Sequence, residues 1–175
     1  MIRRCALAPI VALSLLASTA GQAFAVPITY TLSLAASGVV DGMPFTDEQV
    51  RVQLRADTAD VSSGPGGTTL TIDCGKSVCT AYVGGLAFGI ASIFKFKQHK
   101  DNPTQITLAV VGKNIGRLFL VKPRFASYKL GTPIGPIEVS LAFKAPLTVR
   151  VRTNGRPSTV MVTSITGNHV RLEAR

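Results

Sequence analysis

The sequence has few of the side chains that carry most enzyme chemistry. Its 175 residues include no tryptophan, two histidines and three cysteines, and nine acidic residues stand against 19 Lys and Arg. Neither His99 nor His169 lies in a recognised catalytic motif, and the sequence contains no G-x-S-x-G elbow and no P-loop. We therefore expect a protein that is not an enzyme, with no catalytic residues and no cofactor.

The acidic residues are too scattered to mark a hydrolytic site or a metal site. A glycosidase needs two carboxylates facing each other across a cleft, and nothing in the sequence pattern brings two together. Asp57 and Asp60, with Asp41 and Asp47 upstream, could supply oxygens to calcium. The alternative is that Asp57 and Asp60 form an ordinary turn by hydrogen bonding to their own backbone. We favour the turn and expect no metal.

Apolar residues at helical spacing are missing from residue 26 onward. They alternate instead with polar residues, as in ITYTLSLA (28–35) and EQVRVQLRA (48–56), which is typical of strands with one buried face. Asn154-Gly155 is the strongest hairpin signal. The pattern predicts an all-β fold, an antiparallel two-sheet β-sandwich with a jelly-roll-like form as one option. Further strands are expected at TTLTI, CTAYV, LAFGIASIFKF, QITLAVV, GRLFLV, FASYKL, IEVSLAF, LTVRVR, STVMVTSI and HVRLEA.

The N-terminus has the features of a secretory signal peptide. Arg3 and Arg4 precede an apolar run that is short for a membrane span, and Ala23-Phe24-Ala25 fits a signal-peptidase site. We therefore expect a helical signal peptide over 1–25 and a single domain over 26–175, with no transmembrane segment after cleavage. The protein is then secreted or periplasmic. An uncleaved anchor helix is the alternative, and the arginine pair also hints at a twin-arginine signal.

The cysteines agree with export. Cys5 leaves with the signal peptide, and Cys74 and Cys79 remain as an even pair, which predicts a disulfide in an oxidising compartment. If residues 75–78 form a hairpin loop, the two cysteines flank it on neighbouring strands and can reach each other. A redox-active pair is less favoured. A zinc site is less favoured still, because no second cysteine pair or histidine pair completes four ligands.

Positive charge is concentrated in the second half of the chain. Without Arg3 and Arg4 there are 17 Lys and Arg against nine acids, a formal charge of +8. Residues 26–90 hold three basic and six acidic residues, a net charge of −3, whereas residues 91–175 hold 14 basic and three acidic residues, a net charge of +11. This asymmetry favours an anionic partner, although the two halves could also pack with opposite charges facing each other.

The candidate binding residues lie on two strands. In IFKFKQHK (93–100), strand register places Lys95 and Lys97 on one face and the two phenylalanines on the other. The lysines could be the solvated face of an ordinary edge strand or a site for an anionic polysaccharide or lipopolysaccharide. Nucleic acid is not favoured, because the aromatic rings alternate away from the charges. If the strand LTVRVR lies beside this one, the cations form one stripe, with these members: Lys95, Lys97, Lys100, Arg150 and Arg152.

Two stretches of the sequence resemble a set of exported bacterial proteins of uncharacterised function. They are residues 28–61, with SG, DG and PFT turns between alternating strands, and residues 125–139, where FASYKL leads to IGPI. Many proteins of that set carry a C-terminal sorting tail with a Pro-Glu-Pro motif. This sequence ends at RLEAR without such a tail. The resemblance implies export and an all-β fold, and it implies no catalytic residues.

Taken together, these features favour an exported, non-enzymatic β-sandwich protein. We expect it to bind an anionic polymer or to serve as an extracellular structural component. A secreted hydrolase acting on polysaccharide or peptidoglycan is the alternative, and it requires a cleft lined by two carboxylates. A subunit that adds an edge strand to a partner is the third possibility.

Overall fold

The computed structural model describes residues 25–111, 117–144 and 146–175. Residues 1–24, nearly all of the expected signal peptide, lie outside the described residues. Within the described ranges, no helix is long and apolar enough to span a membrane. The elements follow in this order: β1 (Pro27–Val40), β2 (Met43–Asp57), η1 (Thr58–Asp60), β3 (Val61–Gly64), β4 (Gly67–Asp73), β5 (Cys79–Val83), β6 (Leu86–Ile90), β7 (Ile93–His99), β8 (Gln105–Val110), β9 (Arg117–Val121), η2 (Pro123–Ala126), β10 (Ile134–Lys144), β11 (Leu147–Thr153) and β12 (Arg156–Ala174).

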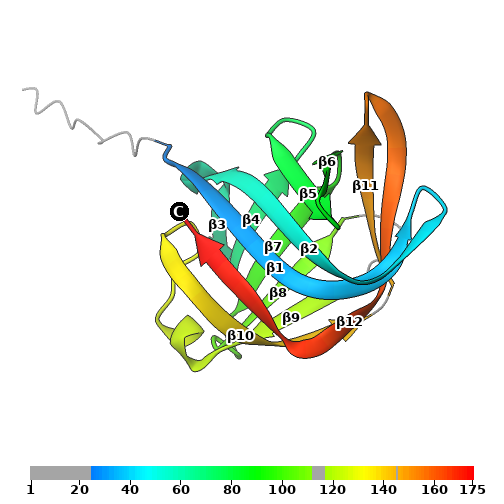
Figure 1. Ribbon diagram of the computed structural model, residues 1–175. Helices are drawn as coiled ribbons and strands as arrows, with labels where there is room; N and C mark the ends of the chain where they lie inside the picture. The colour runs from blue at the N-terminus through cyan, green and yellow to red at the C-terminus, as the bar shows by residue number, and fades with distance from the viewer. Residues whose placement is uncertain (1–24, 112–116, 145) are drawn as a thin grey trace, which may run out of the picture.

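Six of the strands close into an antiparallel barrel. In the order β1, β2, β5, β6, β11 and β12 each strand is hydrogen-bonded to the next, and β12 pairs with β1 to complete the ring. The other strands extend from β12 in the order β10, β9, β8, β7, β4 and β3. In Figure 1, β4, β7 and β8 lie behind β1 and β2. The sequence prediction of an antiparallel all-β fold is confirmed.

The length of β12 explains why the strands form one connected sheet instead of the two separate sheets of the expected sandwich. One edge of β12 pairs with β1 along most of its length. The other edge pairs with β11 over residues 156–162 and then with β10 over residues 169–174, apart from an irregularity near its end. The barrel and the outer strands therefore share β12. The sequence predicted two strands here, but one strand runs through this segment, with an irregularity at Gly167, where φ is +76° and the register with β1 shifts.

Two further strand predictions are wrong in detail. The segment 86–96 was expected as one strand, but it divides into β6 and β7 at Ala91 and Ser92. The buried Ser92 hydroxyl accepts a hydrogen bond from the Arg150 backbone N–H (2.8 Å), which fixes this corner against β11. The segment 125–130 was also expected as a strand. Pro123 begins the short helix η2 instead, because its fixed φ suits a first helical turn.

The core follows from the alternation seen in the sequence. In β1 every second residue from Ile28 to Val40 is buried, and the residues between them are partly exposed. Tyr30, Phe96 and Phe125 are among the largest fully buried side chains. Burying an apolar side chain of this kind contributes about 1.5–3 kcal/mol to folding. A cavity of about 40 Å³ in the interior is lined only by apolar side chains, and it is far smaller than an ordinary ligand pocket.

Cys74 and Cys79 form the expected disulfide, with their Cα atoms 5.4 Å apart. The segment between them is not the expected hairpin loop, because β4 pairs with β3 and β7 while β5 pairs with β2 and β6. Asp73 shapes this turn, since its carboxylate accepts a hydrogen bond from the Gly75 N–H (2.9 Å). The disulfide therefore ties a barrel strand to a strand of the outer sheet.

Candidate anion-binding face

A row of basic side chains crosses the outer sheet. Lys95 on β7 lies opposite Ala109 on β8, Ala109 lies opposite Arg117 on β9, and Arg117 lies opposite Lys144 on β10. Directly opposed residues of antiparallel strands project from the same face of a sheet. Lys95, Arg117 and Lys144 are all exposed, so they share the outer surface. Lys97 is on the same side of β7, and we call these four residues the cationic face.

The sheet sets the spacing of these charges. Neighbouring strands lie about 4.8 Å apart, so the backbone positions of Arg117 and Lys144 are about 5 Å apart and those of Lys95 and Arg117 about 10 Å. Lys97 follows Lys95 by two residues, about 7 Å along the same strand. Ladders hold β7, β8 and β9 on both sides, and Lys144 at the end of β10 is paired with Arg117, so the backbone positions of the four residues are set by the sheet.

Negative charge is scarce around the cationic face. Strands β7, β8 and β9 contain no acidic residue. The flanking strands contribute Asp73 at the end of β4 and Glu138 near the start of β10. Among the residues that the structure describes, the ion pairs are Lys76–Asp73 and Arg175–Glu173, and neither involves the cationic face. Its charge is therefore free to act on a ligand, most strongly at low ionic strength.

In IFKFKQHK the predicted assignment of side chains to the two faces of the strand is confirmed. The suggestion that this segment is an edge strand is wrong. Phe94 and Phe96 are buried, Lys95 is exposed, and Lys97 is half-buried with its ammonium group near Gly66 in the turn between β3 and β4. However, β7 lies between β4 and β8, so its lysines do not protect a free sheet edge. Protection against strand pairing is therefore not the reason for lysine at these positions.

The other predicted cations lie elsewhere. Arg150 and Arg152 are exposed on β11, which pairs with β12 and β6 and is not a hydrogen-bonded neighbour of β7. Lys100 follows the end of β7, next to Asp101 in the turn to β8. The five predicted residues therefore do not form the single stripe that adjacent strands would have given.

Arg117 and Lys144 were missed by the sequence analysis. Each is the only basic residue of its strand, so neither stands out in the sequence. Only the pairing register brings them into line with Lys95. The excess of positive charge after residue 90 was the one signal that pointed to them.

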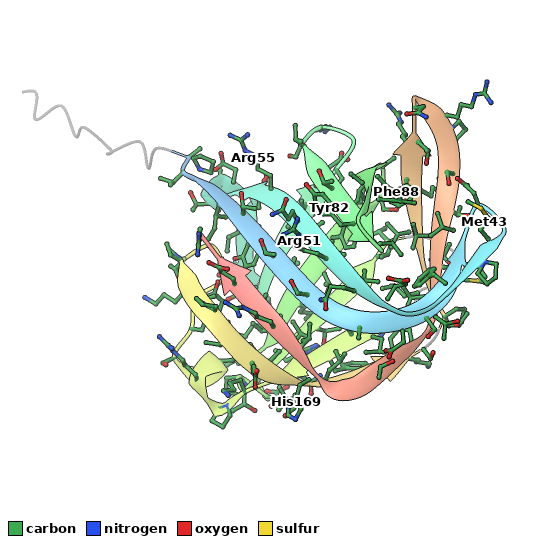
Figure 2. All side chains as sticks on the ribbon, in the orientation of Figure 1. Met43, Arg51, Arg55, Tyr82, Phe88 and His169 are labelled. Carbon is green, nitrogen blue, oxygen red and sulfur yellow. A yellow bond between two sulfur atoms is a disulfide. The ribbon has the colours of Figure 1, made fainter. Side chains whose placement is uncertain are left out.

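The opposite wall, formed by β12, β1, β2 and β5, has a more balanced charge. Arg51 stacks over the Tyr82 ring, with its guanidinium carbon 4.4 Å from the ring centroid. Figure 2 shows both side chains on the β2–β5 side that faces the viewer. Ser33 on β1 lies between Arg51 on β2 and Arg171 on β12. Arg171 lies opposite Glu138 of β10 on its other side, and Arg175 pairs with Glu173. This wall is therefore a weaker candidate for an anionic ligand.

Asp57, Asp60 and His99 take part in local hydrogen bonds. The Asp57 carboxylate accepts from the Ala59 N–H (2.8 Å), and the Asp60 carboxylate accepts from the Asp57 N–H (3.1 Å). These bonds cap η1, so the turn interpretation of the two aspartates is confirmed. His99 contacts the Thr107 hydroxyl through Nε2 (3.4 Å), and His169 is exposed on β12. No group of three metal-ligating side chains gathers within the described ranges.

Models of protein families, curated proteins and solved structures each give no match. The resemblance to exported bacterial proteins therefore stays a prediction, and the function has to be inferred from the charges and cavities of the chain itself.

Proposed function

We propose that the protein is exported and binds an anionic polymer, an acidic polysaccharide or the phosphate-bearing sugars of a lipopolysaccharide, through the cationic face. What supports the proposal is the row formed by Lys95, Arg117 and Lys144, which crosses neighbouring strands with no acidic residue on β7, β8 or β9. The protein acts by binding, without catalysis and without a cofactor or metal.

The arrangement suits a polymer better than a single small anion. Exposed ion pairs contribute only about 0.2–1 kcal/mol each, so one lysine cannot hold a ligand at useful affinity. A chain with repeated anionic groups can contact several cations at once, and each contact after the first is favoured by its high effective concentration. The strand pairing fixes the backbone positions of the cations, so no backbone segment has to be ordered on binding.

Retention on a heparin column tests this proposal. Two double variants remove the same charge, K95Q/R117Q from the cationic face and R150Q/R152Q from β11. We expect K95Q/R117Q to elute at clearly lower salt than the wild type and R150Q/R152Q to elute close to it. Equal shifts for the two variants would show that net charge alone causes retention, and the cationic face would then be rejected as the site.

A hydrolase is the second candidate, because two acidic residues line one cavity. Asp41 and Glu48 both line a cavity of about 370 Å³ at one end of the barrel. Its other lining residues are mostly apolar, whereas a sugar cleft needs many hydrogen-bonding groups for hydroxyls. Release of reducing sugars from peptidoglycan or acidic polysaccharide, abolished in Glu48→Gln, would favour this candidate over simple binding.

A further inference from the structure

Three tight hairpins meet at one end of the barrel. The turns are Asp41-Gly42 between β1 and β2, Gly84-Gly85 between β5 and β6, and Asn154-Gly155 between β11 and β12. All six turn residues have positive φ, between 50° and 86°. This is the geometry of two-residue turns that match the twist of their strands. Asn154-Gly155 was the expected hairpin, and this prediction is confirmed.

The cavity of about 370 Å³ opens between these hairpins and draws its lining from all three. Its size falls in the range of small-molecule pockets. The apolar part of the lining consists of Val40, Met43, Pro44, Phe45, Val83, Leu86 and Phe88. Figure 2 shows Met43 at the β1–β2 hairpin and Phe88 near β11. Met43 and Leu86 are each 64% exposed, which is unusual for large apolar side chains.

The charge of this cavity is opposite to that of the rest of the molecule. Its lining contains two carboxylates, Asp41 and Glu48, and no basic residue. The Glu48 carboxylate reaches from β2 to the β5–β6 turn, where it lies against Gly84. Asp41 accepts a hydrogen bond from Ser158, and it also faces a neighbouring hollow that contains Arg150 and Arg152. Glu48 is therefore the principal negative group of the cavity.

We propose that this cavity binds an apolar amine, a molecule that joins an aliphatic or aromatic group to a positively charged nitrogen. The apolar group fills the space between Met43, Leu86 and Phe88. The ammonium group lies at the mouth beside the exposed Glu48 carboxylate. Neither an anionic polymer nor a neutral sugar fits this combination of an apolar lining and an acidic mouth.

A titration of six-carbon probes into protein labelled with ¹³C at the methionine methyls tests the proposal. The probes are hexylamine, 1-hexanol and hexanoate, which share an apolar chain and differ in charge. The three methionines are Met1, Met43 and Met161. Met43 lines the cavity, whereas Met161 on β12 does not, so it is an internal control. We expect hexylamine to shift the Met43 signal at the lowest concentration and hexanoate at the highest.

Variants separate the charge from the apolar contact. Glu48→Gln should weaken hexylamine binding roughly two- to fivefold and leave 1-hexanol binding unchanged, because only one exposed charge contact is lost. Leu86→Lys should weaken hexylamine binding at least as much, since it places a cation at the mouth and keeps Met43 as the reporter. The matched control Glu138→Gln removes an acid from β10, outside the lining, and should change nothing.

Three results would overturn the proposal. Equal affinity for hexylamine and 1-hexanol would show that charge has no part in binding. A Met43 signal unmoved by every probe would show that the cavity binds none of them. A Met43 signal that shifts with protein concentration alone, together with a dimer in light scattering, would show that a second copy occupies the mouth. None of these results bears on the cationic face, so the two proposals can fail separately.

Discussion

At the scale of single residues, a pair of tyrosines links the barrel to the segment that follows η2. The Gly131 N–H donates to the Tyr30 hydroxyl oxygen (2.8 Å), and the Tyr128 hydroxyl donates to the Thr132 carbonyl oxygen (2.8 Å). The two hydroxyl oxygens are 3.3 Å apart. Because the proton of Tyr128 is already used, Tyr30 is the donor between them. Every polar atom in this chain of bonds therefore has a partner.

Tyr30→Phe should lower the free energy of unfolding by about 1–3 kcal/mol, because the buried Gly131 N–H loses its only acceptor. Tyr128→Phe should cost less, since Tyr30 still accepts from Gly131 and the Thr132 carbonyl is exposed to water. Urea unfolding of the two variants measures both values. The interpretation is wrong if Tyr128→Phe is the more damaging change.

The same two tyrosines should make the free energy of unfolding fall as the pH rises into the alkaline range. Burial raises the pKa of Tyr30 and of Tyr128 above the ordinary value, and the hydrogen bond of Tyr30 to Tyr128 does not reverse this. The unfolded chain loses these protons near pH 10, while the folded chain keeps them. The free energy of unfolding should therefore be unaffected by these groups below about pH 10. Above it, stability should fall by up to about 1.4 kcal/mol per pH unit for each tyrosine.

Urea unfolding between pH 9 and pH 11.5 checks this dependence. Lysines also titrate in this range, so the wild type is compared with the double variant Tyr30→Phe/Tyr128→Phe, which keeps every lysine. The double variant should show a clearly shallower loss of stability above pH 10. The same slope in both proteins would mean that the tyrosines do not titrate as described.

At the scale of the elements, closure of the barrel depends on the contact between β1 and β12. Their register shifts between Ser37 and Gly38, and Gly38 is buried at this irregular point. A Cβ at residue 38 would overlap the Met161 carbonyl oxygen and approach the Phe45 ring at 2.9 Å. Glycine is therefore required here for close approach of two backbones.

Gly38→Ala should destabilise the protein by roughly 1–3 kcal/mol or more, because the added methyl group forces β1 and β12 apart. Gly64→Ala is the matched control. Gly64 lies on β3, where a Cβ would meet nothing within 4 Å. Thermal unfolding should show a large loss of Tm for the first variant and almost none for the second. A Gly38→Ala protein as stable as the wild type would contradict the described β1–β12 contact.

The sequence predicts which side chains of a strand are buried, but not which strands pair. Period-two alternation correctly placed Phe94 and Phe96 inside and Lys95 outside, because burial of alternate side chains is a local property of a strand. Alternation says nothing of which strands are neighbours. The closure of the barrel through β12 was therefore not predictable, and neither was the alignment of Arg117 with Lys95.

At the scale of the whole molecule, opposite charges occupy different places. The cationic face lies on the outer strands β7 to β10, whereas Asp41 and Glu48 line the cavity at the hairpin end of the barrel. The −3 and +11 halves of the sequence therefore do not simply neutralise each other across an interface. Each charge remains available to a ligand of its own kind, a polymer on the sheet and an amine at the mouth.

The most direct test of the central proposal is an NMR titration of ¹⁵N-labelled protein with a heparin oligosaccharide. We predict that the amide signals that move at low salt belong mainly to β7, β8 and β9, and that the shifts disappear near 1 M salt, where screening reaches about 3 Å. Shifts centred on β1, β2 and β12, or no shift at low salt, would contradict the proposal that the cationic face binds anionic polymers.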